Sequence, residues 1–141
     1  MVVETYKSII CGFFPPRHGD IIYADRELYR HYGIYAGNNK VIHFAAYGDS
    51  EIKGENALVH ETTLPEFLKG GKARIDHDSE SVFSRKETVE RAYACIGQKG
   101  YNLVFNNCEN FARWCKTGIS RSTQVEKAVA SIVDTISKIF S

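Results

Sequence analysis

Residues 106–111 read Asn-Asn-Cys-Glu-Asn-Phe, a stretch that joins a helix-start signal to a cysteine. An asparagine side chain accepts hydrogen bonds from the first free N–H groups of a helix, so Asn106 or Asn107 predicts an N-cap. We therefore expect a helix from Cys108 to about Lys116. The free N–H groups and the positive end of the helix dipole favour a thiolate at this position, which predicts a lowered thiol pKa. Cys108 is a candidate nucleophile, although a cysteine is often only a small buried apolar residue.

Two histidines lie upstream, in a stretch that predicts a β-hairpin. Residues 29–36 and 40–47 are rich in tyrosine, isoleucine and valine, and the Gly-Asn-Asn between them is a turn signal. A three-residue turn would place Gly33 opposite His43. Since side chains alternate along a strand, His31 and His43 would then be diagonal neighbours on one face. A two-residue turn would place them on opposite faces.

Cysteine and histidine side chains in this arrangement are typical of a thiol nucleophile. One imidazole must take the thiol proton, and a third group must orient that imidazole. Either histidine alone would more often be a core or surface residue, but two on one face beside a helix-capped cysteine predict a site. We interpret the other histidines as surface residues without a partner pattern. They are His18, His60 and His77.

The remaining pattern predicts strands first and helices second. We expect strands at residues 20–24, 57–62 and 72–77, and a short helical turn at 65–68. Residues 48–56 read as a polar loop. From Ser84 the apolar period becomes helical, and Ser84 with Glu87 fits a capping box. The chain is therefore expected to be an α+β protein.

The composition narrows the class of protein. A length of 141 residues predicts one domain, and a net charge of +1 argues against a nucleic-acid partner. No stretch approaches the roughly 20 apolar residues of a membrane span, and a secretory signal is not recognisable. The cysteines form no CxxC pair, so we expect no zinc site and no cofactor. These features predict a reduced, cytoplasmic protein that touches membranes peripherally at most.

Two longer runs resemble the lecithin:retinol acyltransferase-like family. Residues 31–43, HYGIYAGNNKVIH, resemble its first motif, and residues 106–115, NNCENFARWC, resemble its second. Gly19-Asp20 is similar to the strand that opens the domain, so the resemblance covers roughly residues 19–118. It implies a circularly permuted papain-like (NlpC-type) domain, an antiparallel sheet with the nucleophile helix packed against it. It also implies acyl transfer from a phospholipid through a cysteine thioester to water, an amine, a lysolipid or an alcohol.

The resemblance assigns roles to single positions. Cys108 matches the nucleophile, His31 matches the base, and His43 matches the third, orienting residue. Tyr29 matches an aromatic residue that helps to hold the oxyanion. The chain departs from the family pattern at Asn110, where the family usually has a histidine outside the catalytic three. No metal or cofactor is implied.

The chain ends in a predicted amphipathic helix, to which the resemblance does not extend. We divide the chain into a lead-in (residues 1–18), a catalytic domain (19–118) and this C-terminal helix (119–141). Its apolar stripe predicts packing in the core, a homodimer contact, or peripheral contact with a membrane. The stripe comprises Val125, Val129, Ile132, Val133, Ile136 and Phe140.

Two rival functions stay open at this point. The permuted papain fold also hosts cysteine peptidases and amidases, and the substrate class separates these from a lipid enzyme. The same two motifs also occur in proteins whose role is to bind a partner. An intact set of Cys108, His31 and His43 favours an enzyme.

Overall fold

A computed structural model describes residues 15–27, 29–46, 57–77, 80–99, 107–119 and 123–140, with the side chains of the last range described from residue 129. The first 14 residues of the predicted lead-in and the predicted polar loop at 48–56 lie outside the described residues. So does residue 47, the predicted end of the second hairpin strand. The structure therefore tests the predicted elements between these gaps.

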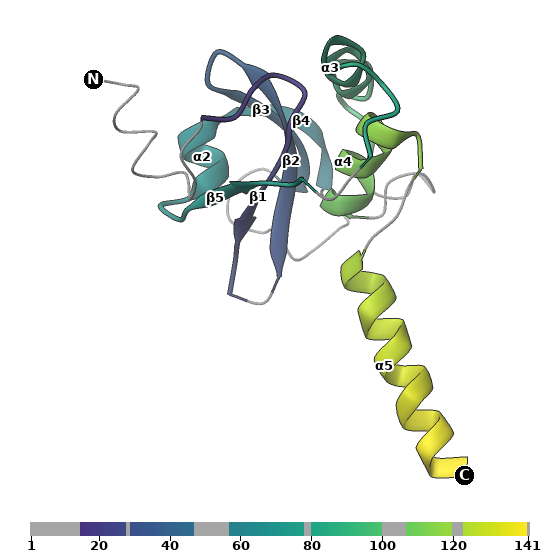
Figure 1. Cartoon of the computed structure of the whole chain (residues 1–141). Coiled ribbons are helices and arrows are strands. Elements are labelled where there is room, and N and C mark those ends of the chain that lie inside the picture. Colours follow the sequence, from purple (N-terminus) through teal and green to yellow (C-terminus); the bar gives the residue numbers. More distant parts are fainter. Residues whose placement is uncertain are drawn as a thin grey trace.

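An antiparallel sheet of five strands forms the centre of the molecule, in the order β4-β3-β2-β1-β5 (Figure 1). The strands are β1 (Ile21–Asp25), β2 (Arg30–Gly37), β3 (Lys40–Ala46), β4 (Ala57–Thr63) and β5 (Ala73–Ile75). The helices are α2 (Leu64–Leu68), α3 (Arg85–Ala94), α4 (Cys108–Thr117) and α5 (Thr123–Phe140). The predicted α+β class with an antiparallel sheet is confirmed.

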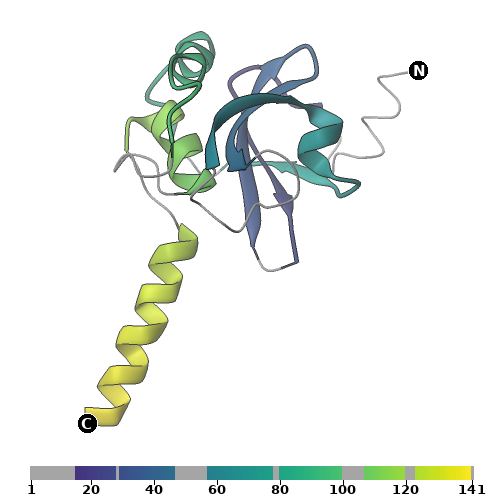
Figure 2. The same ribbon diagram turned by 180° about the vertical axis from the view of Figure 1, so that it is seen from behind.

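Each face of the sheet is covered by different helices. Helix α4 lies across β2 and is backed by α3, whereas α2 covers the other face (Figures 1 and 2). The alternation along β2 decides which residues meet which helix. Tyr32 and Ile34 pack with Phe111 of α4, and the intervening Gly33 faces Phe67 of α2. Two apolar layers therefore hold the sheet, one on each side.

The hairpin of β2 and β3 has the predicted register but not the predicted turn. Gly37 pairs with Lys40, so the turn has two residues, Asn38 and Asn39, whose φ angles are 49° and 66°. Asparagine tolerates this left-handed conformation better than most residues, and such a turn matches the twist of a hairpin. A bulge between Tyr35 and Gly37 then shifts the pairing by one residue. The expectation of a three-residue turn was wrong. The bulge nevertheless produces the pairing of Gly33 with His43 that such a turn predicted.

Helix α4 begins and ends where the sequence predicts. The side chain of Asn107 caps its start by accepting a hydrogen bond of 2.8 Å from the N–H of Asn110. Gly118 ends it in a left-handed conformation, with φ at 78°. The predicted capping box of Ser84 and Glu87 is present at the start of α3. These local signals place Cys108 in the first turn of a buried helix.

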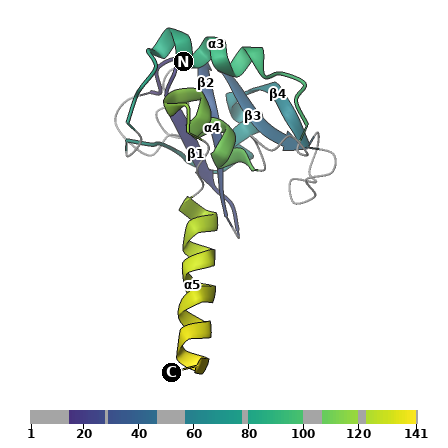
Figure 3. The ribbon, with the colours of Figure 1, turned by 90° about the vertical axis from the view of Figure 1, so that its right-hand side faces the viewer.

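Helix α5 extends away from the sheet and the other helices (Figure 3). Its described side chains, from Val129 to Phe140, are all exposed, including Ile132, Val133 and Ile136 of the predicted stripe. The expectation that the stripe packs in the core is therefore wrong for these residues. Within the part of the chain that the structure describes, no helix is both long and apolar enough to span a membrane.

Candidate active site

The two histidines of the hairpin form a buried pair on one face of the sheet. The Nε2 atom of His31 lies 2.8 Å from the Nδ1 atom of His43, which is hydrogen-bonding distance. Their ring centroids are 5.0 Å apart and the ring planes are at 74° to each other. The observed pairing of Gly33 with His43 brings these side chains together. Only 2% of His31 and 6% of His43 is exposed, so the pair is shielded from solvent.

A phenylalanine and a glycine shape the space around this pair. The ring of Phe67, from α2, lies 5.1 Å from the ring of His31 and 5.6 Å from that of His43. A Cβ atom on Gly33 would lie 2.8 Å from this phenylalanine ring and 2.7 Å from Val41 Cγ1. The absence of a side chain at Gly33 therefore lets Phe67 pack over the histidines. Sequence reasoning did not identify Phe67, because a single aromatic residue in a short helical turn carries no functional signal.

Cys108 is held against the main chain on both sides of His31. Its Sγ atom lies 3.7 Å from the carbonyl oxygen of Arg30, to which the thiol donates. The sulfur also accepts a hydrogen bond from the N–H of Tyr32. Since Arg30 and Tyr32 flank His31 in the chain, the sulfur sits beside the segment of β2 that carries this histidine.

The orientation of β2 explains how a helix on one face reaches this segment. The main-chain groups of Tyr29 and Tyr35 bond on the β1 side of the strand. By the alternation of an antiparallel ladder, those of Arg30 and Tyr32 point to the opposite edge, toward β3. The described register of β2 with β3 stops at Gly33. The sulfur therefore bonds to the edge of β2 beyond the end of that register.

The thiol of Cys108 is not poised as a thiolate in this arrangement. Burial raises its pKa to about 11, and the carboxylate of Glu109 acts in the same direction. The N–H groups of Tyr32, Glu109 and Cys108 lower the pKa, but burial outweighs them. The predicted lowered pKa is therefore wrong, because loss of hydration costs the thiolate more than the helix start returns. A base would have to take its proton before this thiol could act as a nucleophile.

This raised pKa predicts how Cys108 responds to alkylation. Below its pKa the thiolate fraction grows about tenfold per pH unit, so we expect the rate of iodoacetamide labelling to rise about tenfold per unit between pH 7 and 10. Peptide mass spectrometry at each pH would measure the rate. The buried thiols of Cys95 and Cys115, whose pKa values are also raised, serve as internal controls and should react more slowly. A rate that is flat above pH 7 would contradict this prediction.

A buried ionic network holds the start of α4 in place. Arg113 donates to Glu109 at 2.8 Å, one turn before it on α4, and to Asp76, beyond β5, at 3.3 Å. Glu109 is fully buried and Asp76 is nearly so. Because Glu109 directly follows Cys108, this network couples the position of the cysteine to the sheet.

The residue predicted to hold the oxyanion, Tyr29, also lies beside the pair. The ring of Tyr29 is half-buried, and its centroid is 6.3 Å from that of His31, edge to face. Asn110, at the position where the family usually has a histidine, is buried in α4 and donates through its N–H to the cap residue. The structure thus places Tyr29 next to His31 and gives Asn110 a part in the helix start.

A third histidine belongs to this cluster, contrary to expectation. His60, interpreted as a surface residue, is only 9% exposed and pairs with His43 across β3 and β4. Their ring centroids are 4.5 Å apart. The residue was missed because the pairing register of β3 with β4 cannot be read from the sequence of either strand alone. The other two, His18 and His77, are exposed as predicted.

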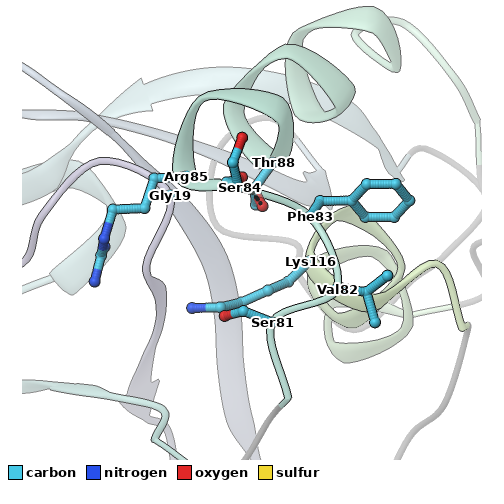
Figure 4. Close-up of a pocket in the computed structure, with 8 residues that line it drawn as sticks. All are labelled: Gly19, Ser81, Val82, Phe83, Ser84, Arg85, Thr88 and Lys116. Atoms are coloured by element: carbon cyan, nitrogen blue, oxygen red, sulfur yellow. Dashed lines mark hydrogen bonds between the residues drawn. The ribbon is translucent and has the colours of Figure 1, made fainter.

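A separate pocket of about 430 Å³ lies near the other end of α4 (Figure 4). It lies between the start of α3 and Lys116, a nearly buried residue. Burial lowers the pKa of Lys116, and Arg85 does so too, whereas Asp20 and Asp76 oppose them. Eight residues of helix, about 12 Å, separate Lys116 from Cys108. This pocket is therefore distinct from the histidine pair.

Among the described residues, no group of three or more His, Cys, Asp or Glu side chains could hold a metal ion.

Known proteins match this chain over most of its length. The family model described as lecithin retinol acyltransferase matches residues 15–121. Phospholipase A and acyltransferase 3 of Mus musculus is 33% identical over 132 residues, covering 83% of this chain and 80% of the mouse protein. Phospholipase A and acyltransferase 2 of Homo sapiens is 32% identical, with the same coverage. Lecithin retinol acyltransferase of Rattus norvegicus is 29% identical, over 77% of this chain and 58% of the rat protein.

These matches confirm the resemblance that the two motifs carried. The matched range includes both motifs, the whole sheet, and the helix that begins at Cys108. The chain belongs to the lecithin retinol acyltransferase family.

Proposed function

We propose that this chain is a thiol-dependent acyltransferase or phospholipase that transfers an acyl group of a phospholipid through a cysteine thioester. One observation carries the proposal: the sulfur of Cys108 bonds to the main chain of Arg30 and Tyr32, on either side of His31. The ring of His31 is in turn within hydrogen-bonding distance of His43. Nucleophile, base and orienting group thus come from one helix and two adjacent strands. Relatives named phospholipase A and acyltransferase support this class of chemistry.

The order of the elements supports a circularly permuted papain-like fold. In this chain, the strands that carry the two histidines precede the helix that carries the cysteine. Helix α4 packs on an antiparallel sheet with Cys108 in its first turn. We propose that residues 19–118 form the catalytic unit of this fold.

The proposed role of His31 as the base sets the proton positions in the histidine pair. For His31 to act as the base, one ring nitrogen must keep a free lone pair. Its Nε2 atom is engaged with Nδ1 of His43, so Nε2–H donates and Nδ1 of His31 takes the proton of Cys108. His43 accepts at Nδ1 and carries its own proton on Nε2. In this way His43 orients His31 and stabilises the imidazolium that forms.

The reaction then follows in two balanced steps. His31 takes the thiol proton, and the sulfur attacks the ester carbonyl of the phospholipid. The tetrahedral intermediate expels the lysolipid alkoxide, which takes the proton from His31 and leaves the acyl thioester on Cys108. An acceptor O–H or N–H next gives its proton to His31 and attacks the thioester, and the sulfur leaves and is reprotonated. Tyr29 is the proposed side-chain donor to the oxyanion.

A substrate panel tests this function against the peptidase and non-catalytic alternatives. The purified chain should release fatty acid or a transferred acyl product from vesicles of phosphatidylcholine, and should leave unstructured peptides intact. Mass spectrometry of lipids and peptides after the same incubation measures both arms, with Cys108→Ala as the blank. Peptide cleavage without lipid turnover would favour the peptidase. No turnover of either substrate, with Cys108 unreactive to acylating probes, would favour a binding protein.

Helix α5 is proposed to act in access to the substrate rather than in the chemistry. Its exposed apolar residues extend from the sheet-bearing part of the chain, and its Asp134 and Lys138 form an exposed ion pair. A phospholipid substrate lies in a bilayer, so an apolar helix that rests on the membrane surface would bring the site to it. We therefore propose peripheral membrane contact through residues 119–141, with a second copy of the chain as the rival occupant.

Truncation after residue 121 should separate these roles. We expect the shortened chain to keep its melting temperature within a few degrees, since the described side chains of α5 are exposed. Cys108 should stay reactive toward a small thiol probe, whereas activity on vesicles should fall more than activity on a short-chain monomeric ester. Liposome sedimentation and light scattering of both proteins would check this. A change in oligomeric state without loss of vesicle binding would assign α5 to dimer formation, and unfolding would refute both roles.

A further inference from the structure

Four neighbouring aromatic rings lie in a row along one face of the sheet. Tyr29 and His31 are on or next to β2, His43 is on β3, and His60 is on β4, with ring centroids 6.3, 5.0 and 4.5 Å apart in that order. The last and shortest spacing joins His43 to His60, whose planes are at 61°. The two residues are direct partners across β3 and β4. The proposed mechanism uses the first three rings but has no part for His60.

The ring of His60 is anchored to the main chain. The main-chain carbonyl groups of Glu61 and Ala45 lie near this ring, and both favour its protonated form. Ala45 lies on β3, two residues after His43, so His60 is tied to the strand segment that carries His43. Burial lowers the pKa of His60, and these carbonyl groups oppose that shift. A neutral ring is therefore held next to His43.

Because the proposed orienting group, His43, is an imidazole rather than a carboxylate, its ring must be kept in one orientation. A carboxylate in this role offers two oxygens and several lone pairs, so it accepts a hydrogen bond over a broad range of rotation. The imidazole of His43 offers a single lone pair at Nδ1, which lies in the plane of the ring. Rotation about the bond to the ring would turn this lone pair away from Nε2 of His31. The contact of 2.8 Å therefore depends on what fixes the plane of His43.

Among the described residues, the rings of His60 and Phe67 also lie against that of His43. Phe67 lies at 5.6 Å with its plane at 62°, and His60 lies at 4.5 Å. We propose that His60 is a positioning residue of the site, which holds the ring of His43 in the plane where Nδ1 meets Nε2 of His31. This deepens the proposed function and rests on it for its kinetic consequence, but the geometry can be tested without catalysis.

The test compares His60→Ala, which removes the ring, with His60→Phe, which keeps a flat ring of similar size. The exposed His77→Ala is the matched control. The first readout is the ¹⁵N chemical shifts of His31 and His43 in the full chain, which report the tautomer of each ring. The second is kcat and KM on phosphatidylcholine vesicles. Melting temperatures accompany both readouts.

We expect His60→Ala to move the Nδ1 shift of His43 toward that of a free, mixed tautomer. It should also lower kcat about 10- to 100-fold, with KM within about twofold, because a misplaced catalytic group costs rate rather than binding. His60→Phe should restore the wild-type shifts and most of kcat, and His77→Ala should change neither readout. This pattern would support the positioning role.

Two results would overturn it. Unchanged shifts and kcat in a folded His60→Ala would show that His43 is held without this ring. Equal losses in His60→Phe and His60→Ala would show that a flat ring packed at this position does not hold His43, and would contradict the proposal. If His60→Ala does not fold, the ¹⁵N shifts of His60→Phe still test the proposal. Wild-type shifts in this variant would support it, and shifts of a mixed tautomer at His43 would contradict it. Should the chain not act on lipid at all, the shifts test the geometry alone.

Discussion

Replacing Cys108 by alanine should abolish turnover, by on the order of 10⁴-fold or more, while leaving the fold intact. The sulfur is the proposed atom that bonds to the acyl group, and no other group can form the thioester in its place. The side chain is small and sits in the first turn of α4, so its loss should cost little stability. Acyl release from phosphatidylcholine vesicles and thermal unfolding measure the two effects.

A matched control separates chemistry from packing in this experiment. Cys95→Ala removes another buried thiol, at the end of α3, and should keep activity within about threefold. In the wild type, a short reaction quenched in acid should yield a peptide that contains Cys108 and carries one acyl group, which hydroxylamine removes. Lipid cleavage that persists undiminished in Cys108→Ala would refute the assignment of the nucleophile.

His31→Ala should lower kcat/KM by about 10²- to 10⁴-fold, the usual contribution of a general base, and His43→Ala should cost less. The reason is geometric: His31 is on the segment that the sulfur of Cys108 contacts, and His43 acts through its bond to His31. With a thiol pKa of about 11, little thiolate exists near neutral pH, so the base cannot be dispensed with. Initial rates of the two variants on the same vesicles measure the difference.

The pH dependence of the His31→Ala variant provides a check on this second prediction. If His31 is the base, raising the pH should partly rescue His31→Ala, because hydroxide forms the thiolate that the histidine otherwise provides. Cys108→Ala should show no rescue. A loss in His43→Ala larger than that in His31→Ala would reverse the two roles and contradict the proposed mechanism.

Local signals in the sequence correctly predicted the start of α4 at Cys108. The signals that begin and end α4 act over only a few residues, so their effect can be predicted without the rest of the chain. They comprise Asn107, Cys108 and Gly118. The capping box of Ser84 and Glu87 is equally local. Such signals depend on the main chain of one element only.

The hairpin shows where local reasoning reaches its limit. The pairing of Gly33 with His43 is as predicted, but a two-residue turn and a bulge produce it together. Turn residues predict a turn, whereas the bulge between Tyr35 and Gly37 adds one residue to the strand without a turn signal of its own. The right pairing was thus obtained through the wrong turn.

By itself, the sequence determined the helix start at Cys108, the strands that carry His31 and His43, and the family to which both motifs belong. The surroundings of these residues arise from the packing of segments that are far apart in the chain. This packing put the sulfur on the main chain beside His31, buried it so that the thiol stays protonated, and brought His60 against His43. The two sets of features differ in the distance along the chain over which their interactions act. Caps and turns act over about four residues, whereas desolvation and cross-strand contacts depend on segments that meet only when the chain has folded.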